Sequence, residues 1–495
     1  MTASRLACLL AGAGLLCACA VAGGGPDGAS GQADAADPPV GGNPGSGGRS
    51  AGGSSGAAGL GAGGSQTPGV GGTVGGGGTG AGGNRPSDGG SDAATSTGDA
   101  RGGAGGAAGS PAGTGGTSGA SGSHWVGTWG GAPQLTEVAN LPPAPLSNST
   151  LRQVVHVSLG GDQIRVRFSN EFGDGPLTIN QAHVAVCPAS PVDSSIDPTT
   201  DRALSFSGRP SITIAQGAAV WSEPLAFSVA ALGNLSITIA FGSVPGAVTG
   251  HPGSRTTSYQ QAGAGNLGAA SLAAAQPTDH WYVLSGVDVL AGAGARAVVV
   301  LGDSISDGRG STTNRNDRWP DDLARRVSAG GGPPAAVAVI NQGIGGNAVT
   351  AGGLGPTALA RFSRDVLGQS GARWVILFEG VNDLGGGVGA PAITSAFANL
   401  IAQAHAQGLQ AYGATITPFG SNAYYTAAHE SARQAVNAYI KSGVFDGTID
   451  FDAAVRDSSS PPRLQAAYDS GDGLHLNPAG YQKLADTVDL TLFAR

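Results

Sequence analysis

The chain has 495 residues, of which 89 are glycine and only 12% are charged, and its formal net charge is −8 at pH 7. This acidic balance argues against a nucleic-acid-binding protein, which needs a basic surface. The glycines follow no strict three-residue period, which excludes collagen. Forty-two of them lie in residues 1–123, so we expect this segment to differ in kind from the rest of the chain.

Residues 1–18 are predicted to be a lipoprotein signal peptide. Arg5 precedes an apolar run, Leu6–Leu16, that is too short to span a membrane as a helix. The following Leu16-Cys17-Ala18-Cys19 resembles a bacterial lipoprotein box, with Cys19 as the residue that receives the lipid. We therefore expect an exported cell-envelope lipoprotein, at the outer membrane or the cell surface, whose only membrane contact is this lipid. The alternative is an ordinary cleaved signal, which would make the protein secreted.

Residues 19–123 are predicted to be a disordered linker rich in Gly, Ala and Ser. The segment lacks hydrophobic periodicity and holds almost no aromatic residues, so it cannot bury enough surface to offset the entropy of the chain. A flexible chain of about 100 residues has an r.m.s. reach of about 50–60 Å. That reach is enough to hold a folded domain away from a membrane surface.

Residues 124–292 are predicted to form an antiparallel β-sandwich domain, because their apolar residues alternate with a period of two. Val155 and Val157 alternate before the turn signal Gly160-Gly161-Asp162, and Ile164 and Val166 alternate after it, which predicts a β-hairpin. Further short strands are expected at residues 177–179, 211–214, 235–239 and 281–284.

Residues 293–495 follow a different pattern, in which compact apolar runs alternate with helix-period stretches. Strands are expected at residues 297–301, 335–340, 374–378, 410–415 and 448–451, and helices at 319–327, 394–407, 427–442 and 479–493. This alternation predicts an α/β fold with a parallel sheet covered on both faces. Groups that carry chemistry should then lie at the carboxyl ends of the strands.

Candidate reactive residues follow several of these strands. Ser304 comes directly after the first strand, where a helix N-terminus favours a developing negative charge. Glycines after the second strand let backbone N–H groups approach a ligand, and Asn382 after the third can donate to an oxyanion. Near the C-terminus, Asp472 precedes His475 by three residues and can orient its ring, so that the other ring nitrogen accepts a serine proton.

Four short blocks, taken together and in this order, resemble the SGNH or GDSL hydrolase family over about residues 295–495. The blocks are Gly302-Asp303-Ser304-Ile305, Asn341–Asn347, Glu379–Asp383 and Asp472-Gly473-Leu474-His475. The resemblance implies a flavodoxin-like three-layer α/β/α domain that hydrolyses carboxylic esters. It implies no cofactor, and the sequence shows no metal-ligand cluster, so we expect neither.

The resemblance also implies roles for individual residues. Ser304 would be the nucleophile, His475 the general base and Asp472 the carboxylate that orients it. The oxyanion hole would be formed by the backbone N–H groups of Ser304 and Gly346 and by the side chain of Asn382. Gly343, Gly345 and Gly346 compete for the second donor position, and we choose Gly346 because it lies five residues after Asn341, as in the family's pattern.

The front region resembles a bacterial subgroup in which a β-sandwich precedes the SGNH domain. The similar segments are Trp125–Trp129, Leu151-Arg152-Gln153, Arg167–Gly173 and His251–Ser258. Some members of that subgroup resemble xylan-acting acetyl esterases, which implies an acetylated polysaccharide or oligosaccharide as substrate. His251 and Arg255 are expected either to line the cleft or to hold the two domains together.

Two alternatives to this function stay open at this stage. The protein could be a lipase or arylesterase acting on small or lipid esters, or a non-catalytic lipoprotein that binds glycans at the surface. Glu379 and Asp383 also invite interpretation as a glycosidase carboxylate pair. Asn382 between them has a better role in an oxyanion hole, so we disfavour that interpretation.

Overall fold

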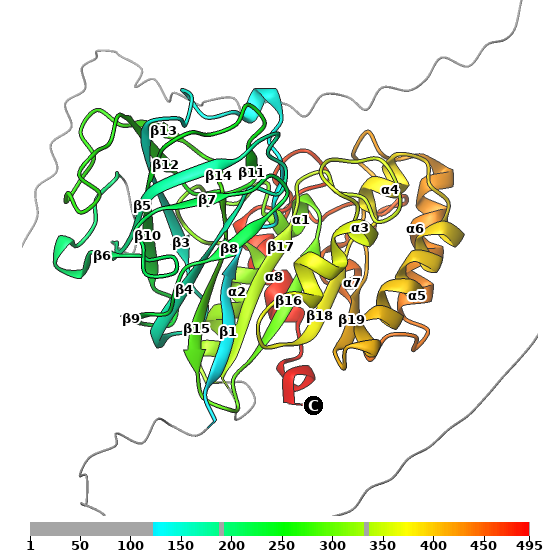
Figure 1. The fold of residues 1–495 in the computed structure, drawn as a ribbon. Coiled ribbons are helices and arrows are strands. Elements are labelled where there is room, and N and C mark those ends of the chain that lie inside the picture. The colour runs from blue at the N-terminus through cyan, green and yellow to red at the C-terminus, as the bar shows by residue number, and fades with distance from the viewer. Residues whose placement is uncertain (1–121, 188–192, 331–335, 495) are drawn as a thin grey trace, which may run out of the picture. The chain divides into compact units, whose positions relative to one another are not determined.

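The computed structural model describes residues 122–187, 193–330 and 336–494 (Figure 1). The predicted signal peptide, Cys19 and nearly all of the predicted linker lie outside these ranges. Within them, no helix is both long enough and apolar enough to cross a membrane. The described chain forms an antiparallel region followed by an α/β region.

The antiparallel region contains two main sheets and a small third one. The first has the order β1-β15-β4-β8, with β9 also paired to β4. Its strands are β1 (His124–Gly130), β15 (Leu284–Ala291), β4 (Gly161–Ser169), β8 (Ala219–Trp221) and β9 (Leu225–Val229). The small sheet has the order β14-β11-β2 and is formed by Trp281–Tyr282, Thr249–His251 and Gln134–Leu135.

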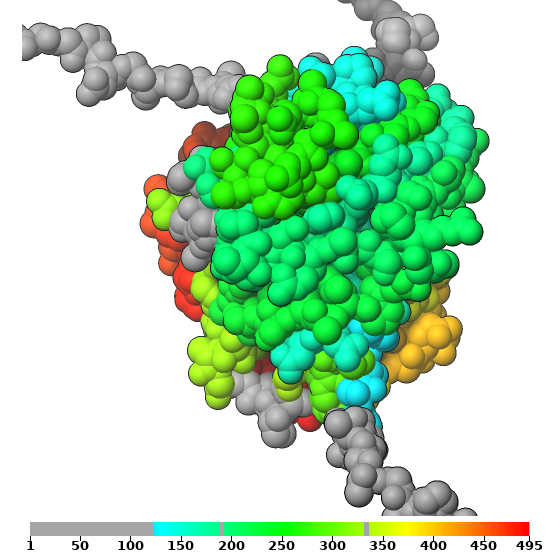
Figure 2. All heavy atoms as spheres, turned by 60° about the vertical axis from the view of Figure 1, so that its left-hand side comes forward, coloured from blue at the N-terminus to red at the C-terminus, as the bar shows by residue number. Residues whose placement is uncertain are grey.

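The second main sheet has the order β13-β12-β3-β10-β5-β6, with β7 also paired to β5. Its strands are β13 (Gln276–Thr278), β12 (Ser258–Ala262), β3 (Ser149–His156), β10 (Asn234–Phe241), β5 (Leu177–Val186), β6 (Arg202–Ala203) and β7 (Ile212–Ile214). Two 3-10 helices, η1 (Val138–Asn140) and η2 (Pro198–Thr200), lie in the connections. Inward-facing residues of both main sheets share one hydrophobic core, so the two sheets form a sandwich. Strands and loops of this region form most of the face seen in Figure 2.

The predicted hairpin at residues 155–168 is wrong. β3 pairs with β10 and β12, whereas β4 pairs with β15, β8 and β9, so the two strands belong to different sheets. Val155 and Val166 nevertheless face the same core. Alternation reports which side of a strand is buried and does not report its partner, because an arch between two sheets leaves the same pattern as a hairpin.

The strand expected at residues 281–284 is divided in two. Trp281 and Tyr282 form β14 of the small sheet, whereas Leu284 begins β15 of the first main sheet. Val283 between them has a φ of 65°, in the left-handed region. This conformation turns the chain from one sheet into the other.

The α/β region contains a five-stranded parallel sheet with the order β17-β16-β18-β19-β20. Its strands are β16 (Arg296–Gly302), β17 (Val337–Gly343), β18 (Ala372–Phe378), β19 (Gln410–Ala414) and β20 (Gly447–Ile449). In sequence order this arrangement reads 2-1-3-4-5, which is the flavodoxin-like topology. The predicted fold class is confirmed.

Helices cover both faces of the parallel sheet (Figure 1). α2 (Trp319–Ser328) and α7 (Phe451–Val455) pack against α8 (Pro478–Thr487), and α5 (Ala390–Ala406) packs against α6 (Ala427–Ile440) and α3 (Ala358–Phe362). The shorter elements are α1 (Ser304–Asp307), the π-helical turn η3 (Ser363–Leu367), α4 (Val381–Gly385) and η4 (Leu490–Ala494). α8 begins after the cap Asn477, whose side chain accepts a hydrogen bond from the Gly480 N–H at 3.0 Å.

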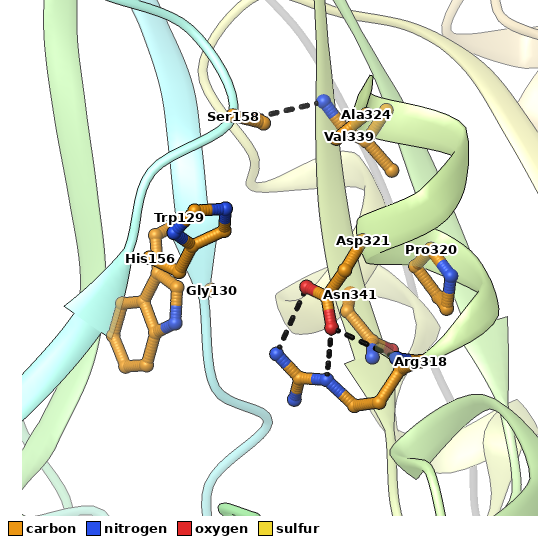
Figure 3. A pocket seen from close by; sticks show the side chains of 10 residues that line it. All are labelled: Trp129, Gly130, His156, Ser158, Arg318, Pro320, Asp321, Ala324, Val339 and Asn341. Carbon is orange, nitrogen blue, oxygen red and sulfur yellow. Dashed lines mark hydrogen bonds and ion pairs between the residues drawn. The ribbon is translucent and has the colours of Figure 1, made fainter. Parts of the chain in front are cut away.

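β1 of the sandwich lies against β17, the edge strand of the parallel sheet. Two glycines permit this approach, because a Cβ at Gly127 would lie 2.6 Å from Ile340 Cδ1 and one at Gly130 would lie 2.3 Å from Gln342 Nε2. Nearby, the Val339 N–H donates to Ser158 Oγ at 3.0 Å, as Figure 3 shows. The two regions are therefore joined by a hydrogen bond as well as by close packing.

A small polar cavity lies at this junction (Figure 3). Its volume is about 20 Å³, enough for one water molecule, and Trp129 and His156 face Arg318 and Asp321 across it. Arg318 and Asp321 form a buried ion pair, with Nε and Oδ2 separated by 2.7 Å. None of the predicted site residues lines this cavity.

Candidate active site

Ser304 begins the one-turn helix α1 at the carboxyl end of β16. Asp303 caps this turn, and its side chain accepts a hydrogen bond from the Ile305 N–H at 2.9 Å. A Cβ at Gly302 would lie 2.1 Å from Ser306 Oγ, so the sharp turn from strand to helix requires glycine there. Ser304 is thus held by local chain geometry, and it is only 4% exposed.

The structure brings Ser304, His475 and Asp472 into one chain of hydrogen bonds. Ser304 Oγ lies 2.8 Å from His475 Nε2, and His475 Nδ1 lies 2.6 Å from Asp472 Oδ2. An ionised carboxylate only accepts hydrogen bonds, so Nδ1 carries the proton of the neutral ring. Nε2 is then available to accept the proton of the serine hydroxyl.

The main chain fixes Asp472 in turn. Its Oδ1 accepts hydrogen bonds from the N–H groups of Leu474 at 2.9 Å and His475 at 2.8 Å. Burial alone would raise the pKa of Asp472, but the hydrogen bond and the charge of the His475 ring, with these two N–H groups, together lower it below its usual range. The carboxyl group therefore remains ionised and acts only as an acceptor.

The three predicted oxyanion donors follow the ends of three adjacent strands. Gly302 of β16 pairs with Gly343 of β17 on one side and with Phe378 of β18 on the other. Ser304, Gly346 and Asn382 follow these three strand ends at the same edge of the sheet. Parallel register therefore accounts for their common location.

Gly346 and Asn382 are linked through a neighbouring residue. Asn382 Nδ2 donates to the backbone oxygen of Asn347 at 2.8 Å, one residue beyond Gly346. Gly346 itself has a φ of 70°, a conformation that glycine adopts at little cost. A Cβ there would also lie 3.0 Å from the Leu354 side chain, so any other residue would require that side chain to shift.

Arg361 is a buried residue of the site that the sequence did not reveal. Its side chain has no exposed surface, and it forms ion pairs with Asp365 and Glu379 at 3.1 Å each. Its other hydrogen bonds join the carboxyl ends of the sheet: to Gln342 O (2.6 Å), Gly302 O (3.0 Å) and Asn347 Oδ1 (3.0 Å). The Arg361 guanidinium therefore bonds to the carboxyl ends of β16 and β17 and to Glu379, which directly follows β18.

The buried carboxyl groups around Arg361 have raised proton affinity. Burial raises the pKa of Asp303 to about 7, and the nearby charges of Asp383 and Asp307 raise it further. The hydrogen bond from the Ile305 N–H and the charge of Arg361 act in the opposite direction and lower it. Burial and the Asp303 charge also raise the pKa of Glu379 well above its usual value, although Arg361 opposes this. Asp303 is thus ionised only in part near neutral pH.

Glu379 and Asp383, the pair considered above for a glycosidase, both have structural partners. Glu379 pairs with Arg361. Asp383 accepts hydrogen bonds from the N–H groups of Val349 at 2.7 Å and Thr350 at 3.0 Å, and so fixes the loop after the oxyanion glycines. These contacts favour the structural interpretation of both carboxylates.

His251 joins the sandwich to the nucleophile turn. Its Nε2 lies 2.9 Å from Asp307 Oδ1, and Asp307 is the last residue of α1. Gly253 packs so closely that a Cβ there would lie 1.6 Å from Asp307 Oδ2. Arg255 belongs to the same loop, and its backbone oxygen accepts from the Asn314 N–H at 2.9 Å. His251 was expected either to line the cleft or to hold the two domains together, and its contact with Asp307 supports the second role.

Two further observations concern ligands and thiols. Among the residues that the structure describes, no group of three or more His, Cys, Asp or Glu side chains could hold a metal ion. Cys187 is buried beside Val154, Ala185 and Ile196, and burial raises the pKa of its thiol to about 12. A thiol in that state is not a reactive nucleophile.

Comparison with known proteins gives this fold and site a class. Residues 300–483 match the model of the GDSL-like lipase/acylhydrolase family. Residues 300–483 of the α/β region therefore form a GDSL-like lipase/acylhydrolase domain, and this domain makes the protein an ester hydrolase. The match begins at residue 300, so the resemblance of residues 124–292 to a particular subgroup stays a prediction.

Among solved structures, the chain is similar to the lipase/acylhydrolase from Enterococcus faecalis, with 19% identity over 40% of this chain and 95% of that one and a TM-score of 0.33. It is also similar to a carbohydrate acetylesterase from Sinorhizobium meliloti, with 16% identity over 40% of this chain and 98% of that one and a TM-score of 0.32. A third similar structure is a member of the lipolytic protein G-D-S-L family from Veillonella parvula, with 19% identity over 40% of this chain and 99% of that one and a TM-score of 0.31. A search of curated proteins found no significant match.

Proposed function

We propose that this protein is an exported serine esterase that removes acetyl groups from carbohydrate. In this proposal Ser304 is the nucleophile, His475 the general base and Asp472 the carboxylate that orients His475. The observation that carries it is the unbroken hydrogen-bonded chain from Ser304 Oγ through His475 to Asp472, with distances of 2.8 and 2.6 Å.

The reaction proceeds in two halves. Ser304 Oγ attacks the ester carbonyl while its proton passes to His475 Nε2, and His475 then protonates the departing sugar oxygen as the ester bond breaks. A water molecule next gives a proton to His475 and attacks the acyl-enzyme. Acetate leaves, and the proton returns from His475 to Ser304.

The developing oxyanion is bound by donors at the carboxyl edge of the sheet. These are the backbone N–H groups of Ser304 and Gly346 and one N–H of Asn382 Nδ2. Asn382 uses its other N–H on the Asn347 backbone oxygen, which supports an amide held in advance of the reaction. Donors fixed in this way need no reorganisation when charge appears, which is the main source of their effect.

Restricted access to the nucleophile favours a short acyl group. Ser304 is 4% exposed and His475 is 6% exposed. Neither residue lines the larger of the two cavities described, which has a volume of about 380 Å³ and lies along β12 and the chain before β3. An acetyl group needs little room beside Ser304, whereas an octanoyl chain needs an extended apolar channel.

The proposal of a carbohydrate substrate rests on the front region. Residues 125–129, 151–153, 167–173 and 251–258 resemble a subgroup that includes xylan acetyl esterase-like proteins. The last of these segments is also the one that packs on α1 through His251 and Gly253, so the sandwich borders the nucleophile turn. Loops in such a location commonly set specificity.

Covalent labelling tests the assignment of the nucleophile. A fluorophosphonate probe should label the wild-type protein and the Ser311→Ala variant, and should leave Ser304→Ala unlabelled. Ser311 is a matched control, because it lies just beyond α1 and its Oγ has no hydrogen-bond partner among the described residues. Labelling of Ser304→Ala at the wild-type level would exclude Ser304 as the nucleophile, and failure to label the wild type would favour a non-catalytic glycan-binding protein.

Substrate preference separates the esterase classes. Release of acetate from acetylated xylan, with activity on nitrophenyl acetate at least about a hundredfold above that on nitrophenyl octanoate, is the expected result. Acetylated pectin and chitin define which sugar is preferred. Higher activity on octanoate than on acetate would instead identify a lipase or arylesterase.

Export and anchoring are part of the proposal, on the strength of residues 1–19. Growth with an alkyne-tagged palmitate should label the full-length protein, and Cys19→Ala should abolish the label. Wild-type protein found unlabelled in the culture medium would show an ordinary cleaved signal instead.

A further inference from the structure

Tyr424 contacts a residue of the proposed oxyanion hole although it lies far from it in sequence. Its hydroxyl donates to Asn382 Oδ1 at 3.0 Å. Tyr424 belongs to the turn of residues 420–424, between β19 and α6. No motif in the sequence marks this turn.

The contacts of Asn382 determine which way its side-chain amide points. The Asn347 backbone oxygen can only accept a hydrogen bond, so the atom of Asn382 that lies 2.8 Å from it is the donor Nδ2. The amide oxygen then faces the Tyr424 hydroxyl, which donates to it. With that hydroxyl present, flipping the Asn382 amide breaks its hydrogen bond to Tyr424 as well as the one to Asn347. Without the hydroxyl, a flip breaks only the bond to Asn347. The flipped amide would then present its oxygen to the oxyanion, which needs an N–H donor.

The same turn is attached to the segment that carries Asp472. Asn422 Nδ2 donates to the backbone oxygen of Asp472 at 2.9 Å, and Asn422 Oδ1 accepts from the Tyr424 N–H at 2.9 Å. Gly473 permits this approach: its φ is 73°, and a Cβ there would lie 2.5 Å from Ser421 Oγ. The turn thus joins Asn382 on one side to the Asp472–His475 segment on the other.

Packing restricts the Tyr424 ring as well. A Cβ at Gly385 would lie 2.4 Å from a ring carbon of Tyr424, so the ring lies directly on the last turn of α4, the helix that carries Asn382. On the other side, the Tyr424 backbone oxygen accepts a hydrogen bond from His429 Nδ1 at 2.7 Å. Ring, hydroxyl and main chain are all held in place.

We infer that Tyr424 is a positioning residue of the esterase: its hydroxyl holds the Asn382 amide with Nδ2 toward the oxyanion, and its turn couples that donor to the segment of Asp472 and His475. This inference rests on the proposed function. It adds a residue that acts on the transition state through Asn382.

Tyr424→Phe removes the hydroxyl and keeps the ring. We expect kcat to fall by about tenfold, less than the 10²–10³-fold typical of losing an oxyanion donor, and KM to stay within about twofold. Tyr425→Phe is the matched control, since its hydroxyl forms no hydrogen bond within the part of the chain that the structure describes, and it should retain wild-type kcat. Gly385→Ala should reproduce the loss, because its methyl group displaces the ring.

A double-mutant cycle separates positioning from a general structural role. In the Asn382→Ala background, Tyr424→Phe should cause no further loss of kcat. A tenfold loss in both backgrounds, or wild-type kcat in Tyr424→Phe, would overturn the inference. If Ser304→Ala is inactive while Tyr424→Phe is fully active, only this inference fails; if Ser304→Ala is active, the proposed function itself fails.

Discussion

His251 of the sandwich and Asp307 of the nucleophile turn form a buried hydrogen-bonded pair, with 2.9 Å between Nε2 and Oδ1. The Ala132 backbone oxygen lies 2.9 Å from His251 Nδ1 and can only accept, so Nδ1 carries a proton. Nε2 is the ring nitrogen that faces Asp307. Asp307 Oδ2 is buried and has no hydrogen-bond partner among the described residues, so this carboxyl group depends on the contact between His251 and its Oδ1.

His251→Ala should destabilise the protein, because it leaves the Asp307 carboxyl group buried without its partner. A loss of about 3 kcal/mol in the free energy of unfolding is expected. His251→Gln can still donate to Asp307 and should lose less than half as much. Urea unfolding measures both, and a His251→Ala midpoint equal to that of the wild type would show that the pair does not stabilise the domain junction.

Arg361→Lys should be strongly destabilising although it preserves the charge. A lysine cannot reach Gly302 O, Gln342 O and Asn347 Oδ1 together with Glu379, so buried acceptors would lose their donors. We expect a loss of about 3–5 kcal/mol in the free energy of unfolding. Arg373→Lys is a suitable control, since Arg373 is half-buried and its guanidinium donates to Gly408 O, the one side-chain partner it has among the described residues. Equal denaturation midpoints for the two variants would contradict this prediction.

Asp303→Asn should stabilise the protein at alkaline pH. The folded pKa of Asp303 is about 7, above the ordinary value of 3.8, because the carboxyl group is buried. The folded state therefore binds more protons than the unfolded state between about pH 4 and pH 7, and stability falls as pH rises through that window. The variant avoids this loss, so its free energy of unfolding should rise relative to that of the wild type by about 2–4 kcal/mol between pH 4 and pH 8. Urea unfolding at several pH values measures this difference in the free energy of unfolding, and a difference that does not change with pH would refute the prediction.

Asp472→Asn should reduce kcat by about 10³-fold, because an asparagine can place its N–H toward His475 Nδ1 and so favour the wrong ring tautomer. Hydrogen bonds from His475 and the main chain overcome the effect of burial and lower the pKa of Asp472, so the wild-type carboxylate stays charged throughout the working range. Protonation of Asp472 should accordingly add no step to the acid side of the pH–rate profile down to about pH 5. A variant within tenfold of wild-type kcat would indicate that Ser304 and His475 act without this carboxylate.

Much of the α/β region follows from local sequence. Buried parallel strands appear as compact apolar runs, and each of the expected strands and main helices is present, although the last helix ends at Thr487. The four blocks then locate Ser304, Asn382, Asp472 and His475, because they follow strand ends or precede a capped helix. Parallel register brings the first three blocks together without further information.

Other features depend on contacts between distant segments, which no local pattern encodes. Alternation at β3 and β4 predicted burial correctly and pairing wrongly. Arg361 lies in a helix of ordinary composition, and only the fold shows that its guanidinium reaches three strand ends. Tyr424 reaches Asn382 across a sequence separation of 42 residues. A single sequence carries no signal for such pairs.

The most direct test of the account is the rate of nitrophenyl acetate hydrolysis by purified Ser304→Ala and wild-type protein. Loss of the nucleophile should lower kcat/KM by about 10³-fold or more, with an unchanged circular dichroism spectrum and unfolding midpoint. Ser311→Ala should match the wild type. A Ser304→Ala enzyme that is folded and within tenfold of wild-type kcat/KM would contradict the assignment of Ser304 as nucleophile.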